Sequence, residues 1–314
     1  MSRAPGRGRD SWPPAPATLP HPVTDNHTHL PLEIPEHSGA RPGTEAMTAA
    51  EHLARSEAVG VTRVVHVACD TDSLAPSLAL AEAHPQVAVA VAIHPNEAPL
   101  HAGLREVGPD GLPPPVRPRH DIALDDAIGQ VAEAARHPRV RAIGETGLDF
   151  FRGGKQARSY QRESFRAHIA LAKELDLPLQ IHDREAHRAV VEVLLGDGAP
   201  DRTVFHCFSG DRELAAICAE HGWYASFAGP ITFASNDELR QALRVLPPQL
   251  LLVETDAPYL IPRNLPTVPT VKHRNEPCFL PWVAKQVAQL RPEPEAVVFE
   301  QLMKNGKTFF GITH

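Results

Sequence analysis

The stretch SYQRESFRAHIALAKELDLPLQIH, residues 159–182, consists of a helical segment followed directly by a short apolar run that ends in a histidine. Phe165 and Ile169 recur at the spacing of one helix face, which predicts an amphipathic helix over Ser159–Leu175. The run Leu179-Gln-Ile-His182 that follows is typical of a short buried strand. A helix and a strand in this order form the repeating unit of an α/β fold.

Similar apolar, β-branched runs alternate with helical stretches from near residue 22 to near residue 290. Near-continuous apolar runs are expected of parallel strands that are buried on both faces. Eight such runs in a chain of this length predict a (β/α)8 barrel of the TIM type. A doubly wound open sheet is the competing interpretation, but the first run lacks the glycine-rich phosphate loop that usually follows it there. The predicted strands are Pro22–Asn26, Thr62–Ala68, Val87–Ile93, Val140–Gly144, Leu179–His182, Thr203–His206, Trp223–Phe227 and Leu251–Glu254.

Two segments depart from this alternation. Residues 1–20 are rich in Pro, Gly and Arg and have no apolar centre, so we expect a disordered tail there and not a signal peptide. Residues 21–314 are then expected to form a single barrel domain. Residues from about 97 to 119 contain too much proline and glycine for regular helix, which predicts an irregular insertion in the loop after the third strand.

Composition limits the classes of partner. The chain has 31 Lys and Arg against 38 Asp and Glu, a net charge of −7, so it is a poor candidate for coating nucleic acid broadly and non-specifically. A small site in which metal ions supply the positive charge is still compatible with it. Four widely spaced cysteines form no CxxC pair and fit a reducing cytoplasm. No stretch approaches the roughly 20 apolar residues of a membrane span, and no obligate protein partner is evident.

Metal-binding residue types stand at the ends of several predicted strands, which is where barrels of this type build their active sites. The first strand ends in Asp25-Asn-His27-Thr-His29, and strand alternation places both histidines on one side, as a pincer for a divalent ion. A buried carboxylate is costly without a partner, and a metal is the natural partner in a barrel mouth. The candidate ligands are His27, His29, Glu145, His182, His206 and Asp256.

The motifs around these residues resemble those of the TatD family of metal-dependent deoxyribonucleases. The resemblance extends from about residue 22 to residue 312, and GETGLDF together with VETDAPYL is highly specific. The segments that carry it are DNHTHL (25–30), AIHP (92–95), IGETGLDFF (143–151), QRESFRAHIALAKELDLPLQIHDREA (161–186), FHCFSG (205–210), ASFAGPITF (225–233), LLVETDAPYL (251–260) and RNEP (274–277).

The resemblance implies a two-metal site with zinc, manganese or magnesium as possible ions. It also implies that Asp256 and Glu145 are catalytic, with Asp256 able to accept the proton of the nucleophilic water. The implied ligands are His27, His29 and Asp256 for one ion, His182 and His206 for the other, and Glu145 as a bridge between them.

Two residues, His94 and Arg184, match positions that line the substrate cleft of the family. A guanidinium is a bidentate partner for phosphate, so Arg184 and Arg152 are candidates for contact with a phosphodiester. Lys272 and Arg274, in the loop after the eighth strand, would add positive charge at the same mouth.

We therefore expect a divalent-metal-dependent hydrolase that cleaves phosphodiester bonds of DNA or an oligonucleotide, as a 3′-to-5′ exonuclease on single strands. The ligand ring alone does not select phosphorus over carbon. An amidohydrolase-type enzyme acting on an ester, lactone or amide is therefore an open alternative. A non-catalytic, metal-stabilised binding module is the alternative of another class, although closed structural sites rarely combine a bridging carboxylate with open positions.

Overall fold

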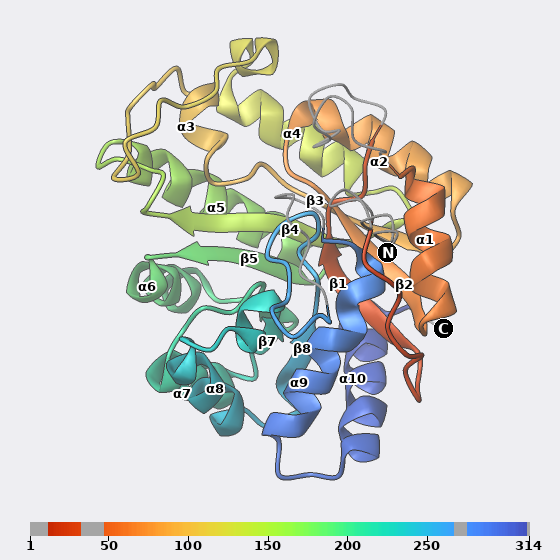
Figure 1. The fold of residues 1–314 in the computed structure, drawn as a ribbon. Coiled ribbons are helices and arrows are strands. Elements are labelled where there is room, and N and C mark those ends of the chain that lie inside the picture. Colours follow the sequence, from red (N-terminus) through yellow and green to blue (C-terminus); the bar gives the residue numbers. More distant parts are fainter. Residues whose placement is uncertain (1–11, 33–46, 267–274, 313–314) are drawn as a thin grey trace, which may run out of the picture.

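The computed structural model describes residues 12–32, 47–266 and 275–312 (Figure 1). Its centre is an eight-stranded sheet in the order β1 to β8, and every neighbouring pair in that order is parallel. All eight predicted strands are present, so the predicted (β/α)8 barrel is confirmed. The strands are β1 (Val23–Thr28), β2 (Val61–Ala68), β3 (Val87–Val91), β4 (Val140–Asp149), β5 (Leu179–Arg184), β6 (Thr203–Phe205), β7 (Tyr224–Phe227) and β8 (Leu251–Val253).

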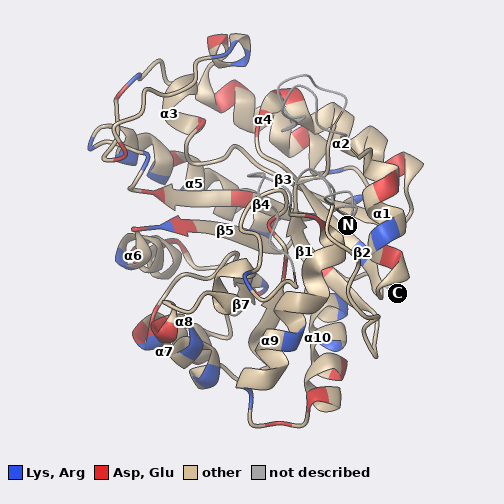
Figure 2. Ribbon diagram, viewed as in Figure 1, with Lys and Arg blue, Asp and Glu red and all other residues tan. Residues whose placement is uncertain are grey.

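Helices follow the strands and surround the sheet (Figure 1). Charged segments lie mainly on these helices and at the strand ends (Figure 2). No helix among the described residues is long and apolar enough to cross a membrane. The helices are α1 (Ala49–Ala58), α2 (Thr71–Ala83), α3 (Ala98–His101), α4 (Leu124–Ala134), α5 (Ala157–Glu174), α6 (His187–Asp197), α7 (Arg212–His221), α8 (Asp237–Val245), α9 (Leu280–Leu290) and α10 (Glu295–Phe310), with single 3₁₀ turns at Pro118–Asp121, Gly229–Thr232, Pro248–Leu250 and Pro277–Phe279.

The strand residues divide between two apolar clusters. Val64 and Val87 belong to the large cluster that the strands share with the helices, whereas Val65 and Ala88, one position further along, belong to a smaller cluster. This smaller cluster also contains Phe309 and neighbouring residues at the end of α10. Because alternate strand residues point to opposite faces, the smaller cluster fills the barrel interior. The interior is therefore packed below the level of the polar strand ends.

Contacts between the first and last strands close the barrel. The backbone N–H of Asp256 donates to the carbonyl of His27 at 3.0 Å, and that of His29 donates to the carbonyl of Ala257 at 2.7 Å. The side-chain amide of Asn26 donates to the carbonyl of Val253 at 2.5 Å. These bonds bring the residues that follow β8 beside the end of β1. His27 and His29 on the first strand therefore become neighbours of Asp256, which follows the last strand.

Strand β4 is longer than predicted, and Glu145 therefore lies inside the strand and not at its end. The expected strand stopped at Gly144, whereas β4 pairs with β5 as far as Asp149, after an irregularity in register between Ile143 and Thr146. Gly147 permits this pairing, because a Cβ there would come within 2.1 Å of the carbonyl oxygen of His182. The glycines thus allow β4 and β5 to approach closely enough for the ladder to continue past Glu145.

The segment after β3 is irregular over residues 102–117, while α3 and a 3₁₀ turn form at its two ends. It is held to the turn after β4 at two points. The guanidinium of Arg152 lies 3.2 Å from the carboxylate of Asp110, and Gly108 packs so closely on the carbonyl of Arg152 that a Cβ would come within 2.1 Å of its oxygen. The insertion is therefore attached beside the barrel mouth.

The expected disorder of residues 1–20 is wrong for the part that the structure describes. The ring of Trp12 packs edge-on against His52 at 5.2 Å, and the guanidinium of Arg55 donates to the carbonyl of Pro13 at 3.1 Å. Leu19 is buried, and its N–H donates to the carbonyl of Val59 at 2.9 Å. Residues 12–20 are bound to α1 because apolar Trp and Leu side chains interrupt the Pro-rich segment. Residues 1–11 lie outside the described residues, as do Lys272 and Arg274.

Deleting residues 1–20 is therefore expected to lower the melting temperature by several degrees. Removing the buried Leu19 and the packed Trp12 ring costs apolar burial, and about 1 kcal/mol corresponds to roughly 2–4 °C in a domain of somewhat smaller size. Thermal unfolding followed by circular dichroism measures the change. The matched control deletes residues 1–11 alone, which should leave the melting temperature nearly unchanged; equal stability of both truncations would contradict the expectation.

Candidate metal centre

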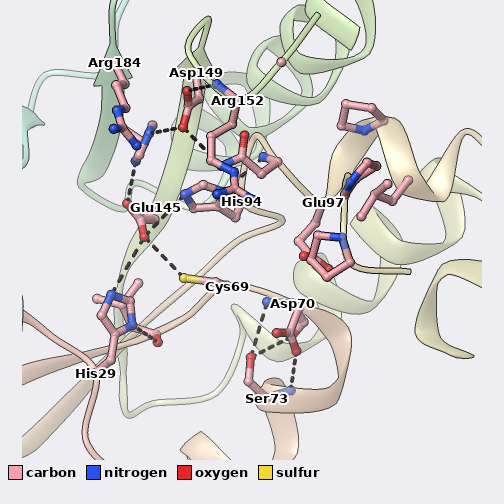
Figure 3. Close-up of a pocket in the computed structure, with 18 of the residues that line it drawn as sticks. His29, Cys69, Asp70, Ser73, His94, Glu97, Glu145, Asp149, Arg152 and Arg184 are labelled. Atoms are coloured by element: carbon pink, nitrogen blue, oxygen red, sulfur yellow. Dashed lines mark hydrogen bonds and ion pairs between the residues drawn. The ribbon is translucent and has the colours of Figure 1, made fainter. Parts of the chain in front are cut away.

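The carboxyl ends of the strands surround a cleft of about 740 Å³. Its floor is formed by candidate metal ligands, and one wall is formed by the insertion after β3 (Figure 3). Figure 3 shows His29, Cys69, His94 and Glu145 directed toward one another across this floor. The cleft thus brings together strand ends that are far apart in the sequence, as the barrel predicts.

Glu145 is the central carboxylate of the cluster, and its two oxygens face different histidines. Oε2 lies 2.6 Å from Nε2 of His206 and 3.1 Å from Nδ1 of His182. Oε1 lies 3.9 Å from Nε2 of His27 and 3.8 Å from Nε2 of His29. The carboxylate therefore stands between two pairs of imidazoles with one oxygen directed toward each.

Asp256 completes the group formed by the first pair of histidines. Its Oδ1 lies 3.6 Å from Nε2 of His29 and 3.9 Å from Nε2 of His27. The ring of His27 stacks on that of His206 with centroids 3.9 Å apart, so the two groups adjoin. All six candidate ligands predicted from the sequence meet in one cluster, although the strands that carry them span most of the chain.

Three of the histidines are oriented by a hydrogen bond from the ring nitrogen that faces away from the cluster to a neighbouring acceptor. Nδ1 of His206 lies 3.2 Å from the buried carboxylate of Glu254, and Nε2 of His182 lies 3.2 Å from Asp149. Nδ1 of His29 lies 3.3 Å from a backbone carbonyl of β2. Because each acceptor takes the N–H of the ring, the opposite nitrogen of the neutral imidazole presents a lone pair to the cluster. This is the usual arrangement around metal-binding histidines.

His94 differs from these three histidines in its hydrogen bonding. Its Nδ1 accepts the backbone N–H of Asn96 at 3.0 Å, so in the neutral ring the proton is on Nε2. That Nε2 lies 3.7 Å from Oε1 of Glu145 and faces the cleft. His94 therefore offers a hydrogen-bond donor where the other histidines offer lone pairs, and this suits contact with an anionic substrate better than metal binding.

The electrostatics of the cluster suit a cation. Burial would raise the pKa of Glu145, but His206 and His94 outweigh it and hold that pKa well below its usual value. Burial lowers the pKa of His27 well below its usual value, which keeps that imidazole neutral. Burial also opposes the charging of His206, yet Glu145 and Glu254 raise its pKa. Since a histidine ligand must be neutral, cation binding at His206 must release a proton. The donor set of imidazoles and ionised carboxylates fits a divalent metal ion.

The two arginines predicted to meet substrate occupy different settings. Arg184 lines the cleft, and its guanidinium lies 4.2 Å from the centroid of the Phe151 ring. Arg152 also lines the cleft but is engaged by Asp110 of the insertion. Arg184 is thus the better placed of the two for contact with a phosphate.

Sequence reasoning missed three residues that contact the cluster: Asp149, Glu254 and Cys69. Asp149 and Glu254 orient His182 and His206, and the thiol of Cys69 donates to Oε1 of Glu145 at 3.4 Å. Two of the three stand in the family motifs, in GLDF and VETD, and Cys69 directly follows β2. Glu254 and Cys69 directly follow buried strands and Asp149 is the last residue of β4, so a polar residue at a strand end is the feature that the three share.

A second group of titratable residues, Glu97, His101 and His120, lies in the wall of the insertion. Nδ1 of His120 accepts the backbone N–H of Arg117 at 2.9 Å, so Nε2 carries the proton, which it donates to Glu97 at 2.7 Å. Nε of Arg119 donates to the same carboxylate at 2.8 Å. The carboxylate of Glu97 thus already accepts two hydrogen bonds. The group is an ion-pair network that joins the end of the insertion to the start of α3.

An α/β barrel whose mouth gathers histidines and carboxylates around a shared glutamate defines a metal-dependent hydrolase. Comparison with known sequences identifies the family within this class. Residues 24–311 match the family described as TatD related DNase, and the chain belongs to that family.

Individual relatives agree with this assignment. A Mycobacterium tuberculosis protein named "Uncharacterized metal-dependent hydrolase TatD" is 38% identical over 286 residues, covering 88% of this chain and 94% of that protein. An Escherichia coli K12 protein named "3'-5' ssDNA/RNA exonuclease TatD" is 38% identical over 205 residues, covering 64% of this chain and 76% of that protein. The crystal structure of YJJV, a TatD homologue from E. coli K12, matches with a TM-score of 0.73 at 26% identity, covering 92% of this chain and 98% of that one.

Replacing Glu254 by glutamine is expected to weaken metal binding by roughly 10–100-fold, the usual effect of removing the partner that orients a ligating histidine. The amide still fits beside Nδ1 of His206, but it brings no negative charge to the imidazole. Isothermal titration of the metal-stripped protein with Mn²⁺ measures the change. Glu238→Gln, an exposed change on α8, is the control. Unchanged affinity in the Glu254 variant would remove that residue from any role in metal binding.

Proposed function

We propose that this metal-dependent hydrolase uses two divalent ions to cleave phosphodiester bonds of single-stranded DNA, beginning at the 3′ end. The observation that carries the proposal is the position of Glu145, with one carboxylate oxygen toward each pair of histidines. His27, His29 and Asp256 would hold one ion, His182 and His206 would hold the other, and Glu145 would contribute one carboxylate oxygen to each site.

Two bound divalent ions supply Lewis acidity toward a phosphodiester and a nearby water. The side chains of the chain supply the remaining roles. Asp256, at the edge of the first group, accepts the proton of the attacking water. His94 donates a hydrogen bond from its Nε2–H to a phosphoryl oxygen, and the Arg184 guanidinium forms an ion pair with the same phosphate. Arg152, fixed by Asp110, borders the substrate at the rim of the cleft.

The preference for a free strand end is supported by shape and by charge. The cleft is bounded on one side by the insertion, and the net charge of −7 repels a long polyanion from most of the surface. The E. coli relative whose name specifies 3′-to-5′ action on single strands supports the same polarity here. Within this proposal, residues 12–312 act as one catalytic domain. The four cysteines, all unpaired, suit the reducing cytoplasm.

The test compares a linear single-stranded oligonucleotide with a covalently closed single-stranded circle, with Mg²⁺, Mn²⁺ or Zn²⁺ supplied in turn. We expect release of mononucleotides from the linear substrate alone, and only when metal is present. Equal cutting of both substrates would refute end-directed action. A linear RNA of the same sequence tests whether the 2′-hydroxyl is tolerated. Inactivity on all nucleic acids, with turnover of a lactone or amide, would assign the site to carbon chemistry.

A further inference from the structure

A row of basic side chains lies along α5, outside the metal centre. Lys155 stands just before the helix, and Arg158, Arg162 and Arg166 follow at intervals of four residues, which places them on one face. Together with Ser159 they line a shallow hollow of about 590 Å³. The row begins where α5 follows β4, so it starts at the barrel mouth (Figure 2).

Two phenylalanines at the end of β4 join this row to the catalytic cleft. The ring of Phe150 lies beneath both Arg158 and Arg162, whose guanidinium carbons are 4.2 and 5.4 Å from its centroid. Phe151 lies in the same way beneath Arg184, at 4.2 Å. The backbone N–H of Phe150 donates to the carbonyl of Arg184 at 2.9 Å, so the two cation–aromatic groups adjoin. The start of the basic row on α5 is therefore close to the edge of the cleft at which Arg184 stands.

The charge of this row is largely uncompensated. Among the described residues, Lys155, Arg158 and Arg162 have no carboxylate within ion-pair distance, whereas Arg166 lies 3.6 Å from Asp197. Among the described residues that line the hollow, Glu163 is the acidic one, and the Glu106 carboxylate lies at the start of α5, where it accepts the backbone N–H groups of Gln156 and Ala157 at 3.0 Å. In a chain with a net charge of −7, such a local positive excess is an attractive site for a polyanion.

The helix that carries the row also forms part of the cleft wall. Ala157 and Gln161 line the cleft, and the neighbouring residues Arg158 and Arg162 line the hollow. Successive arginines of the row are about 6 Å apart along the helix axis, at about 1.5 Å of rise per residue. A strand that leaves the cleft over α5 thus meets a cation at each step, as in the basic grooves that track the backbone of single strands, and the Phe150 ring beneath Arg158 and Arg162 holds their guanidinium groups in place.

We propose that Lys155, Arg158 and Arg162, supported by Phe150, bind the phosphates of a single-stranded nucleic acid upstream of the end held in the cleft. The direction in which the strand runs rests on the proposed exonuclease function. Binding at this row is sequence-independent and raises the affinity for long strands over short ones. It adds a few phosphate contacts to an enzyme whose net charge is −7.

The test measures binding of fluorescent, cleavage-resistant phosphorothioate oligothymidylates by anisotropy with Mn²⁺ present, so that the metal centre is occupied and cleavage does not contribute. One probe has about 20 nucleotides, enough to leave the cleft and reach α5, and the other is a trinucleotide. For Arg158→Gln/Arg162→Gln we expect about tenfold weaker binding of the long probe. We also expect a log–log salt slope that is shallower by about 1.4, because each of the two arginines neutralises one phosphate and contributes about 0.7 to the slope. Binding of the trinucleotide should stay unchanged.

The matched control is Arg136→Gln/Arg244→Gln, which removes the same charge near the ends of α4 and α8 and should bind both probes normally. Arg158→Lys/Arg162→Lys should restore most of the affinity for the long probe. Lys155→Gln/Arg162→Gln is a second test variant that also removes two positive charges from the row. It keeps the contact between Arg158 and Phe150, so it can be used if the first variant folds poorly. Wild-type binding of the long probe by both glutamine variants would overturn the proposal, as would equal weakening of the two probes.

The two proposals fail separately. Length-dependent binding that disappears in the glutamine variants, without cleavage of any nucleic acid, would retain the binding row and reject the proposed reaction. Metal-dependent cleavage that is equally efficient on short and long strands, in the native chain and in the variants, would retain the reaction and reject the row.

Discussion

Replacing Glu145 by glutamine is expected to reduce the rate of DNA cleavage by roughly 10⁴-fold, the upper end of what one catalytic group contributes. The amide keeps the shape of the side chain but presents only one oxygen, whereas the carboxylate presents one oxygen to each pair of histidines. The variant should also bind fewer metal ions. Single-turnover cleavage of a labelled oligonucleotide, with metal content measured on the same sample, checks both expectations.

The control for this variant is again Glu238→Gln, which changes one exposed carboxylate on α8. Removing a buried carboxylate also removes the partner of His206 and His182, so the melting temperature of the metal-stripped proteins should be compared as well. A folded Glu145 variant with two ions and normal turnover would exclude the bridging role.

The second large effect is expected for Asp256→Asn, with a decrease of about 10²- to 10⁴-fold in kcat. Asn keeps a metal-facing oxygen but cannot accept a proton, so KM should change little while the chemical step slows. Asp256→Glu, which retains a base, should recover part of the rate. An asparagine variant with near-normal turnover and full metal content would remove Asp256 from the proton transfer.

The sequence was sufficient to predict the barrel and the six candidate ligands that meet at its mouth, for one physical reason. In a barrel of parallel strands the carboxyl ends converge, so polar residues that terminate apolar runs meet without any further information. His27, His182 and Asp256 are positioned in this way. The prediction depended on recognising strand ends, and short runs such as Thr203–Phe205 were long enough for that purpose.

Features set by backbone contacts between segments could not be predicted. The extension of β4 past Gly144 depends on close approach to β5, which the glycines there do not reveal by themselves. The different role of His94 depends on one backbone N–H, that of Asn96, which fixes its tautomer. The packing of residues 12–20 depends on two apolar side chains in a segment whose composition otherwise resembles a flexible tail.

Net charge was informative about the whole surface but not about its parts. The value of −7 argued against extended contact with nucleic acid, yet the basic residues of α5 are gathered on one face with little compensation. Their helical spacing was visible in the sequence, but the absence of a carboxylate partner for Arg158 and Arg162 among the described residues became evident only from the positions of their neighbours.

The contacts that join β1 to the segment after β8 have a consequence for folding energetics. His27, His29 and Asp256 come from the two edges of the rolled sheet, and the backbone bonds between these edges are few. An ion held by these three residues, as proposed above, would cross-link the two edges and would bind only the closed form of the chain. By thermodynamic linkage, it would stabilise closure by the free energy of its own binding. Metal occupancy and resistance to unfolding should therefore rise together. Substitutions that weaken the contacts between β1 and the segment after β8 should lower the metal affinity before any strand unfolds.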